Sequence, residues 1–155
     1  MDDAVVARAL HVFGVVLWIG GVAFVTTVLL PAVRATRDPA ERVALFEKME
    51  RRFAVQSRIV TLLVGATGLH LVVRGDLWPR FADPAFWWMH GMVLVWAIFT
   101  FMLFVAEPLF LHRWFRARAT DRPEQTFALI QRLHWVLLAA SLIVVLGAVA
   151  GSHGG

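Results

Sequence analysis

The segment HVFGVVLWIGGVAFVTTVLLPAV, residues 11–33, decides the fold, because it contains no charged side chain. It is longer than the roughly 20 apolar residues that an α-helix needs to cross the hydrocarbon core of a bilayer. Acidic residues at the N-terminus can cap a helix that begins near Ala4, and Pro31 is expected to mark its end. The sequence therefore predicts a first transmembrane helix over about residues 4–33.

Three more apolar segments follow along the chain, and they predict spans over about residues 53–73, 85–111 and 127–151. The second span is the weakest of the four, because Gln56 and Arg58 interrupt it. Four spans and the short loops between them account for nearly all of the chain. We therefore expect an all-α fold, an integral membrane four-helix bundle that forms a single membrane domain over residues 1–155.

The segment between the first two spans is polar and basic. Within it, Asp38-Pro39 is typical of a helix start, with Asp38 as the N-cap and Pro39 in the first turn. We expect a short cytoplasmic helix here that runs into the second span.

The composition supports a membrane protein and excludes several kinds of site. Hydrophobic residues make up 59% of the chain and charged residues 17%, whereas soluble domains have about 45–50% and about 25%. There is no cysteine, which excludes disulfides, iron–sulfur clusters and a covalently attached c-type haem. The net charge of +4 comes from loops between apolar runs, so it indicates membrane topology and not binding to nucleic acid.

The distribution of basic residues predicts the orientation. Most of them lie after the first and third spans, while the loop after the second span has two arginines that two aspartates offset. Basic loops stay in the cytoplasm, so both termini are expected outside, in a multi-pass protein of the bacterial inner membrane. The basic residues of the two inner loops are Arg34, Arg37, Arg42, Lys48, Arg51, Arg52, Arg113, Arg116, Arg118, Arg122 and Arg132.

Histidines are the main candidates for function, because an ionisable side chain inside a membrane is costly and tends to mark a site. His11 and His90 each lie about two turns into a span that begins outside, so their rings are expected at a similar depth. Two imidazoles that face each other across a bundle can hold haem iron between them. His70 ends the second span near the same face. All six histidines are His11, His70, His90, His112, His134 and His153.

The first hypothesis is therefore a b-type haem protein with bis-histidine ligation near the periplasmic face. Arg8 and Arg74 lie near the outer surface, where they could pair with haem propionates. Gly14 and Gly21 follow His11 on one helical face, which leaves room for a macrocycle or only for close helix packing.

Copper is the alternative cofactor. Met89 and Met92 flank His90, and thioether with imidazole suits Cu(I). His70, His11 or the tail histidine could complete that site. Met is also an ordinary apolar filler. A third hypothesis is an accessory subunit of a respiratory membrane complex that binds no cofactor of its own.

A carboxylate also lies inside the third span, at Glu107 before Pro108. Arg58, in the inner part of the second span, is its expected partner, because an unpaired charge there is expensive. The pair can be purely structural, or the carboxylate can serve a proton relay or a quinone site.

Across nearly its whole length the chain resembles the CopD-like and HemJ-like group of four-helix membrane proteins. The likeness rests on LHVFGVVLWIGG at 10–21, FEKMERRF at 46–53, WWMHGMVL at 87–94 and a glycine-containing second span. It implies b-haem or copper as the cofactor, with His11 and His90 as the matching positions. Because HemJ-like proteins usually have a lysine where this chain has Met92, the resemblance implies haem binding more than protoporphyrinogen oxidation.

These expectations define a redox protein whose partners are the lipid bilayer and a quinone or a periplasmic electron-transfer protein. A homo-oligomer is compatible with the sequence.

Overall fold

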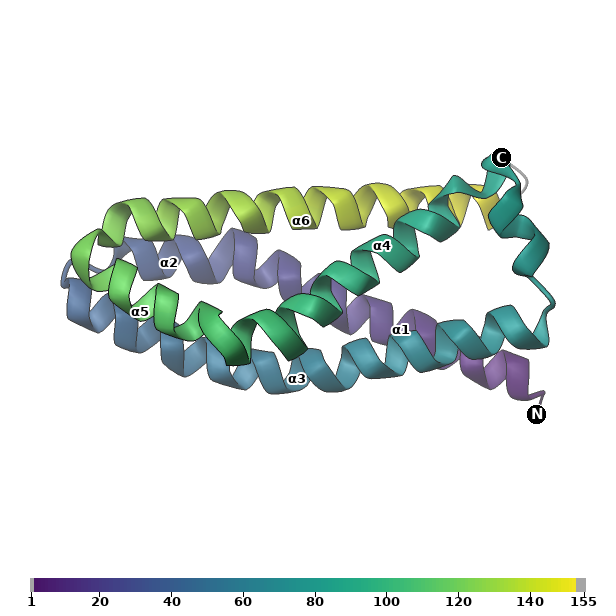
Figure 1. The fold of residues 1–155 in the computed structure, drawn as a ribbon, viewed down its shortest axis with the longest axis horizontal. Helices are drawn as coiled ribbons and strands as arrows, with labels where there is room; N and C mark the ends of the chain where they lie inside the picture. Colours follow the sequence, from purple (N-terminus) through teal and green to yellow (C-terminus); the bar gives the residue numbers. More distant parts are fainter. Residues whose placement is uncertain (1, 153–155) are drawn as a thin grey trace.

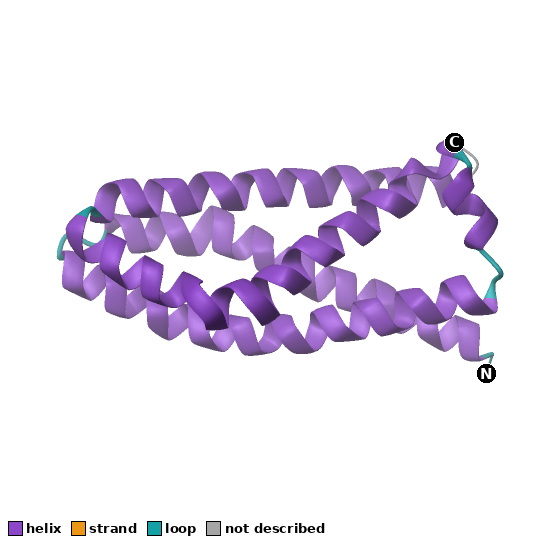
Figure 2. Cartoon of the chain, viewed as in Figure 1, coloured by secondary structure: helices purple, strands orange, loops and turns teal. Residues whose placement is uncertain are grey.

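A computed structural model describes residues 2–152, apart from the side chains of His112 and Thr120. This part of the chain is almost entirely helical and contains no strand (Figure 1 and Figure 2). The elements are α1 (Asp3–Phe24), the π-helical η1 (Val25–Leu29), α2 (Leu30–Ala35), α3 (Pro39–Arg74), the short η2 (Trp78–Ala82) and η3 (Pro84–Phe86), α4 (Trp87–Phe101), the π-helical η4 (Met102–Leu111), α5 (His112–Asp121) and α6 (Pro123–Ser152).

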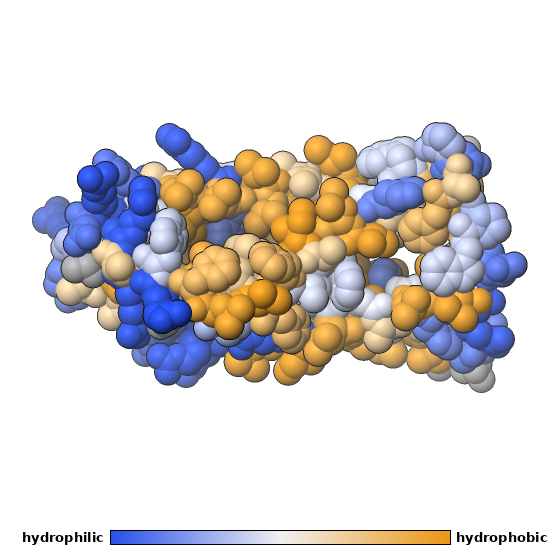
Figure 3. Space-filling view, in the orientation of Figure 1, coloured by the Kyte–Doolittle hydropathy of each residue, from blue (hydrophilic) through white to orange (hydrophobic). Residues whose placement is uncertain are grey.

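Within the described residues, four helical segments are long and apolar enough to cross a membrane. They are Asp3–Ala35, Pro39–Arg74, Pro84–Leu111 and Pro123–Ser152. Figure 3 shows an apolar belt around the middle of the molecule and hydrophilic residues gathered at both ends. Large apolar side chains on this belt are exposed, for example Leu146 at 69%, as expected where lipid replaces water. The chain is thus a multi-pass membrane protein.

Both termini lie at one end of the molecule, which we call the terminal end (Figure 1). The opposite end, which we call the basic end, holds the α2–α3 and α5–α6 turns. α1 lies mainly along α3, and α4 lies mainly along α6. Toward the terminal end, α4 leans to α6 and away from α3 (Figure 1), so the two helix pairs separate there.

Two apolar clusters hold the helices together elsewhere. The middle cluster joins α1, α3 and α6, and consists of Trp18, Ile19, Val22, Val60, Val64 and Leu138. The basic-end cluster consists of Val25, Leu30, Val33, Phe115, Ala119 and Phe127. These clusters pack the helices against one another at the middle and at the basic end.

The helix starts follow the capping residues. Asp2 accepts a hydrogen bond from the amide of Ala4, and Asp38 accepts one from the amide of Ala40. The helix that begins at Pro39 is continuous to Arg74. The segment after the first span thus does run into the second span, as a part of α3 and not as a separate short helix.

The first span does not end at Pro31, in contrast to the prediction. A π-helical turn absorbs the proline, and helix continues to Ala35. In that turn the amide of Leu30 bonds to the carbonyl of Val25, five residues earlier. Pro31 has no N–H to give to the next carbonyl in this pattern, that of Thr26. Gln131 of α6 donates its Nε2 to that carbonyl at 2.7 Å.

The same arrangement occurs in the third span. Pro108 lies inside the π-helical η4, so the carbonyl five residues earlier, that of Leu103, lacks its π-helical donor. Arg58 of α3 donates its Nε to this carbonyl at 3.1 Å. Each proline therefore frees a carbonyl inside the apolar belt, and a polar side chain of another helix satisfies it.

Candidate functional site

His11 is held by the backbone of the neighbouring helix. Its Nδ1 lies 3.1 Å from the carbonyl oxygen of Val64 and 3.1 Å from Oγ1 of Thr67, both on α3. A carbonyl can only accept a hydrogen bond, so Nδ1 carries the proton in this contact. In the neutral ring the lone pair is then on Nε2. The half-buried imidazole is thus fixed in one tautomer, with a free ligand atom.

Glycines allow this contact. A Cβ on Gly68 would lie 3.0 Å from Cε1 of His11, and a Cβ on Gly14 would lie 2.7 Å from the side chain of Val64. α1 and α3 therefore approach closely at these positions. A Cβ on Gly21 would likewise lie 2.6 Å from the ring of Phe53. Of the two roles open to the glycines after His11, the observed one is close helix packing.

His90 lies in another helix pair from His11. It is exposed on α4, and its ring meets the edge of Phe81 with a centroid distance of 5.3 Å. The recorded contacts of His11 are with α3 instead, so the structure does not bring the two rings into contact. The bis-histidine pair stays a prediction.

The two histidines nevertheless lie on the same side of one contact between α1 and α4. Trp18 of α1 and Phe99 of α4 are in ring contact, with a centroid distance of 4.9 Å. His11 precedes Trp18 by roughly 10 Å along its helix, and His90 precedes Phe99 by roughly 13 Å, at ~1.5 Å per residue. Both helices run from the terminal end inward, so both histidines lie on the terminal side of this contact.

The surface is hollowed at this level. In Figure 3 the space lies on the terminal half, between α3 and the α4–α6 pair. It corresponds to the place where the two helix pairs separate in Figure 1.

The other predicted outer residues have partners of their own. Arg74 binds Asp3 through two hydrogen bonds of 3.0 and 3.1 Å. Nε2 of His70 lies 3.6 Å from the same carboxylate. Arg8 is exposed. Asp3 thus gathers Arg74 and His70 at the terminal end, where they tie α1 to α3.

The residues predicted as alternative copper ligands lie in different environments. Met89 is buried at 4% exposure, His90 beside it is exposed, and Met92 is half-buried. His70 contacts Asp3 on another helix pair. In the part of the chain that the structure describes, no cluster of three or more His, Cys, Asp or Glu residues could hold a metal ion. The tail His153 and the side chain of His112 lie outside that part.

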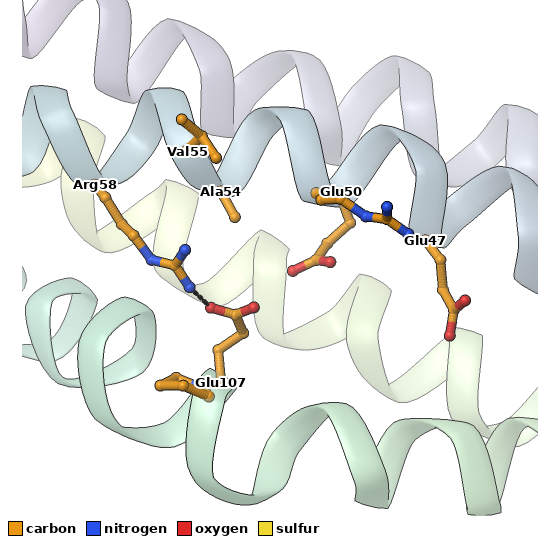
Figure 4. A pocket seen from close by; sticks show the side chains of 8 residues that line it. Glu47, Glu50, Ala54, Val55, Arg58 and Glu107 are labelled. Carbon is orange, nitrogen blue, oxygen red and sulfur yellow. Dashed lines mark hydrogen bonds and ion pairs between the residues drawn. The ribbon is translucent and has the colours of Figure 1, made fainter.

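The intramembrane pair is present. Arg58 donates its Nη2 to Oε2 of Glu107 in addition to the Nε contact with the Leu103 carbonyl. The two groups border a cavity of about 380 Å³ between α3 and η4 (Figure 4). Its other lining residues are Glu47, Glu50, Arg51, Ala54, Val55 and Pro108.

Some contributors to these sites have little signal in the sequence. The carbonyl of Val64 and the hydroxyl of Thr67 orient His11. These partners lie 53 and 56 residues after His11 in the sequence, and no sequence pattern indicates the contact. The cavity residues Glu47 and Glu50 were detectable, because they share a helical face with Arg58. Glu47, which lies toward the basic end of α3, accepts a hydrogen bond from Arg116, and this contact raises the pKa of the Arg116 guanidinium.

Comparisons with models of protein families, with curated proteins and with solved structures find no match. The resemblance to the CopD-like and HemJ-like group therefore stays a prediction.

Proposed function

We propose that the protein binds b-type haem and transfers electrons in the bacterial inner membrane, with both termini outside the cytoplasm. His11 and His90, on the terminal half of the molecule, are the residues that would hold the haem. The observation that carries the proposal is the orientation of His11, whose Nδ1 is engaged by the Val64 carbonyl and the Thr67 hydroxyl.

A histidine that ligates a metal usually donates its other ring N–H to a carbonyl or carboxylate, which fixes the tautomer and raises its basicity. His11 has this arrangement inside an apolar belt, where a ring without a role would be costly. The hollow on the same terminal half of the molecule supports a planar ligand (Figure 3). The residues present thus fit haem on the His11 side.

On the other side, His90 is exposed on α4 and contacts Phe81, so in this proposal its side chain would turn from Phe81 to the haem. Haem b would supply one-electron chemistry. Arg8 and Arg74 are the proposed propionate partners. In this role Arg74 would share its guanidinium between Asp3 and the propionate, since a guanidinium has five donors. The electron partners would be a quinone or a periplasmic protein.

The test is a reduced-minus-oxidised absorption spectrum with metal analysis on the same purified sample. We expect a haem Soret band that His11→Ala and His90→Ala each alter or remove. The matched control is His134→Ala, because His134 lies on α6, where its Nδ1 contacts the Ile130 carbonyl of its own helix. A wild-type protein without a Soret band, or both variants with an unchanged spectrum, would overturn the proposal.

The same sample separates the alternatives. Stoichiometric copper without haem would favour a copper uptake or resistance protein that uses Met89, His90, Met92 and His70. A sample with neither cofactor that co-purifies with a respiratory complex would favour an accessory subunit.

A further inference from the structure

We propose that the cavity between α3 and η4 is a water-filled proton entrance, and that Glu107 is the residue that binds the proton inside the membrane. Along α3 the lining of the cavity runs from Arg58 to Glu47, toward the basic end, the side proposed to face the cytoplasm. Its ligand is water and the proton that water carries. The inference does not depend on haem.

The cavity follows one polar face of α3. Glu47, Glu50, Ala54 and Arg58 have helical spacings of three, four and four residues, so they lie above one another on this face. From Glu47 to Arg58 the face extends roughly 16 Å, at ~1.5 Å per residue. Figure 4 shows the carboxylates of Glu50 and Glu107 turned toward the same space.

The size and lining of the cavity suit water. Its volume of about 380 Å³ exceeds by far the ~30 Å³ that one water molecule takes in the liquid. Its polar lining residues offer several hydrogen-bond partners to each water, which is the second requirement for a hydrated cavity. Lipid tails would instead bring these charges into contact with hydrocarbon, which costs several kcal/mol per unsatisfied group.

The charges around Glu107 balance closely. Arg58 and Arg51 carry positive charge, and Glu47 and Glu50 carry negative charge. Arg58 is held on its far side by the Leu103 carbonyl, so it stays in place and stays charged when Glu107 gains a proton. In that step a hydronium ion in the cavity gives its proton to a Glu107 carboxylate oxygen, and a water molecule remains.

Beyond the ion pair, buried polar atoms continue toward His11. Oγ1 of Thr61 is fully buried, one turn past Arg58 on the same face of α3, and finds no hydrogen-bond partner among the described residues. Among the described residues, the buried atoms Oγ1 of Thr100 on α4 and Nε1 of Trp18 on α1 also find no hydrogen-bond partner. Buried polar groups of this kind bind internal water.

These atoms lie between the two sites. Along α3, Thr61 comes after Arg58 and before Val64 and Thr67, the partners of His11. The whole distance from Arg58 to Thr67 is roughly 13 Å. Internal waters at Thr61, Thr100 and Trp18 would therefore connect the cavity to the level of His11.

The first experiment asks whether the cavity contains water, and it uses the absence of cysteine from the chain. Single cysteines are placed at Val55, which lines the cavity, and at Ile59, which does not. Both are exposed side chains of α3, at 53% and 65%. A charged, membrane-impermeant thiol reagent is added to protein in lipid vesicles, one side at a time.

Because only the thiolate reacts and thiolate forms in water, we expect Val55→Cys to be labelled from the basic end and Ile59→Cys to remain unlabelled. If Val55→Cys is unreactive from both sides, lipid fills the cavity and the proposal fails. If both cysteines react equally, the region lies outside the membrane and the proposal fails as well.

The second experiment follows the proton. Infrared spectra of the protein in vesicles are recorded across a pH titration in H2O and D2O, for wild type, Glu107→Gln and the control Glu41→Gln, an exposed residue of α3 outside the cavity. We expect an infrared band of a protonated carboxyl group that is absent from Glu107→Gln and present in Glu41→Gln. In D2O this band should shift as quickly as exposed backbone amides exchange their hydrogen.

A missing Glu107 band, or one that D2O leaves unshifted, would overturn the assignment. If Glu107→Gln does not accumulate, Glu107→Asp keeps an acid and should move the band without abolishing it. Neither experiment uses the haem spectrum, so a failure here is distinct from a failure of the proposed function.

Discussion

Loss of Arg58 should destabilise the protein strongly, because this side chain satisfies two groups at once. Arg58→Leu leaves both the Glu107 carboxylate and the Leu103 carbonyl without their donor. Breaking a buried ion pair by removing one partner costs about 3–5 kcal/mol. The side chains of Arg58 and Glu107 keep 33% and 24% of their surface exposed, so we expect the low end, about 3 kcal/mol.

A double-mutant cycle separates the two contacts. Glu107→Gln removes the charge but leaves Arg58 on the Leu103 carbonyl, and we expect a loss of about 1.5 kcal/mol. If Arg58→Leu with Glu107→Gln costs about 3 kcal/mol, the coupling energy is about 1.5 kcal/mol, within the range for residues in one network. The assay is unfolding by sodium dodecyl sulfate in mixed micelles, followed by tryptophan fluorescence.

Pro108→Ala tests the contact between Arg58 and the Leu103 carbonyl separately. It restores a backbone N–H to η4, so the Leu103 carbonyl no longer depends on Arg58. In this background the cost of Arg58→Leu should fall by about 1 kcal/mol, the net worth of one hydrogen bond. A coupling between Arg58 and Glu107 below about 0.5 kcal/mol, or an unchanged cost in the Pro108→Ala background, would refute the reasoning.

Three further predictions concern other contacts. Gly65→Ala should destabilise the protein by about 1–3 kcal/mol, because the added Cβ would lie 2.6 Å from a tryptophan ring of α4. The control Gly20→Ala, whose Cβ would have nothing within 4 Å, should be neutral or stabilising in the same unfolding assay. Equal effects of the two substitutions would contradict the packing. Gln131→Leu removes the donor to the carbonyl that Pro31 frees, and the same assay should show a loss of about 0.6–1.7 kcal/mol, while no loss would mean that the carbonyl finds another donor. Thr67→Val removes one hydrogen-bond partner of His11. If His11 holds haem as proposed, this change should weaken haem retention by about 10–100-fold in haem-transfer titrations, the usual effect of losing a group that orients a metal ligand; unchanged retention would contradict this role of Thr67.

The fold could be predicted well from composition and spacing, because four apolar runs of membrane-spanning length leave few alternatives. Asp2 and Asp38 act as the helix caps expected from their positions. Pro31 was misjudged, because a proline ends a helix only where its freed carbonyl has no other donor. That donor is Gln131, which lies 105 residues away and gives no local signal.

The candidate site could be predicted less completely. Arg58 and Glu107 lie in contact, as costly charges in the membrane should, and sequence alone indicated the pair. It did not indicate the cavity beside them, because a cavity depends on how α3 and η4 diverge. The environment of His11 was hidden for a similar reason, since a backbone carbonyl is its main partner and every residue has one.

Low-temperature electron paramagnetic resonance of the oxidised, purified protein tests the central proposal most directly, since it reports the ligands of ferric haem. We expect a low-spin signal typical of two imidazole ligands, which His11→Ala converts to high spin and His134→Ala leaves intact. A wild-type sample that is high spin, or a low-spin signal that survives His11→Ala, would contradict ligation by His11.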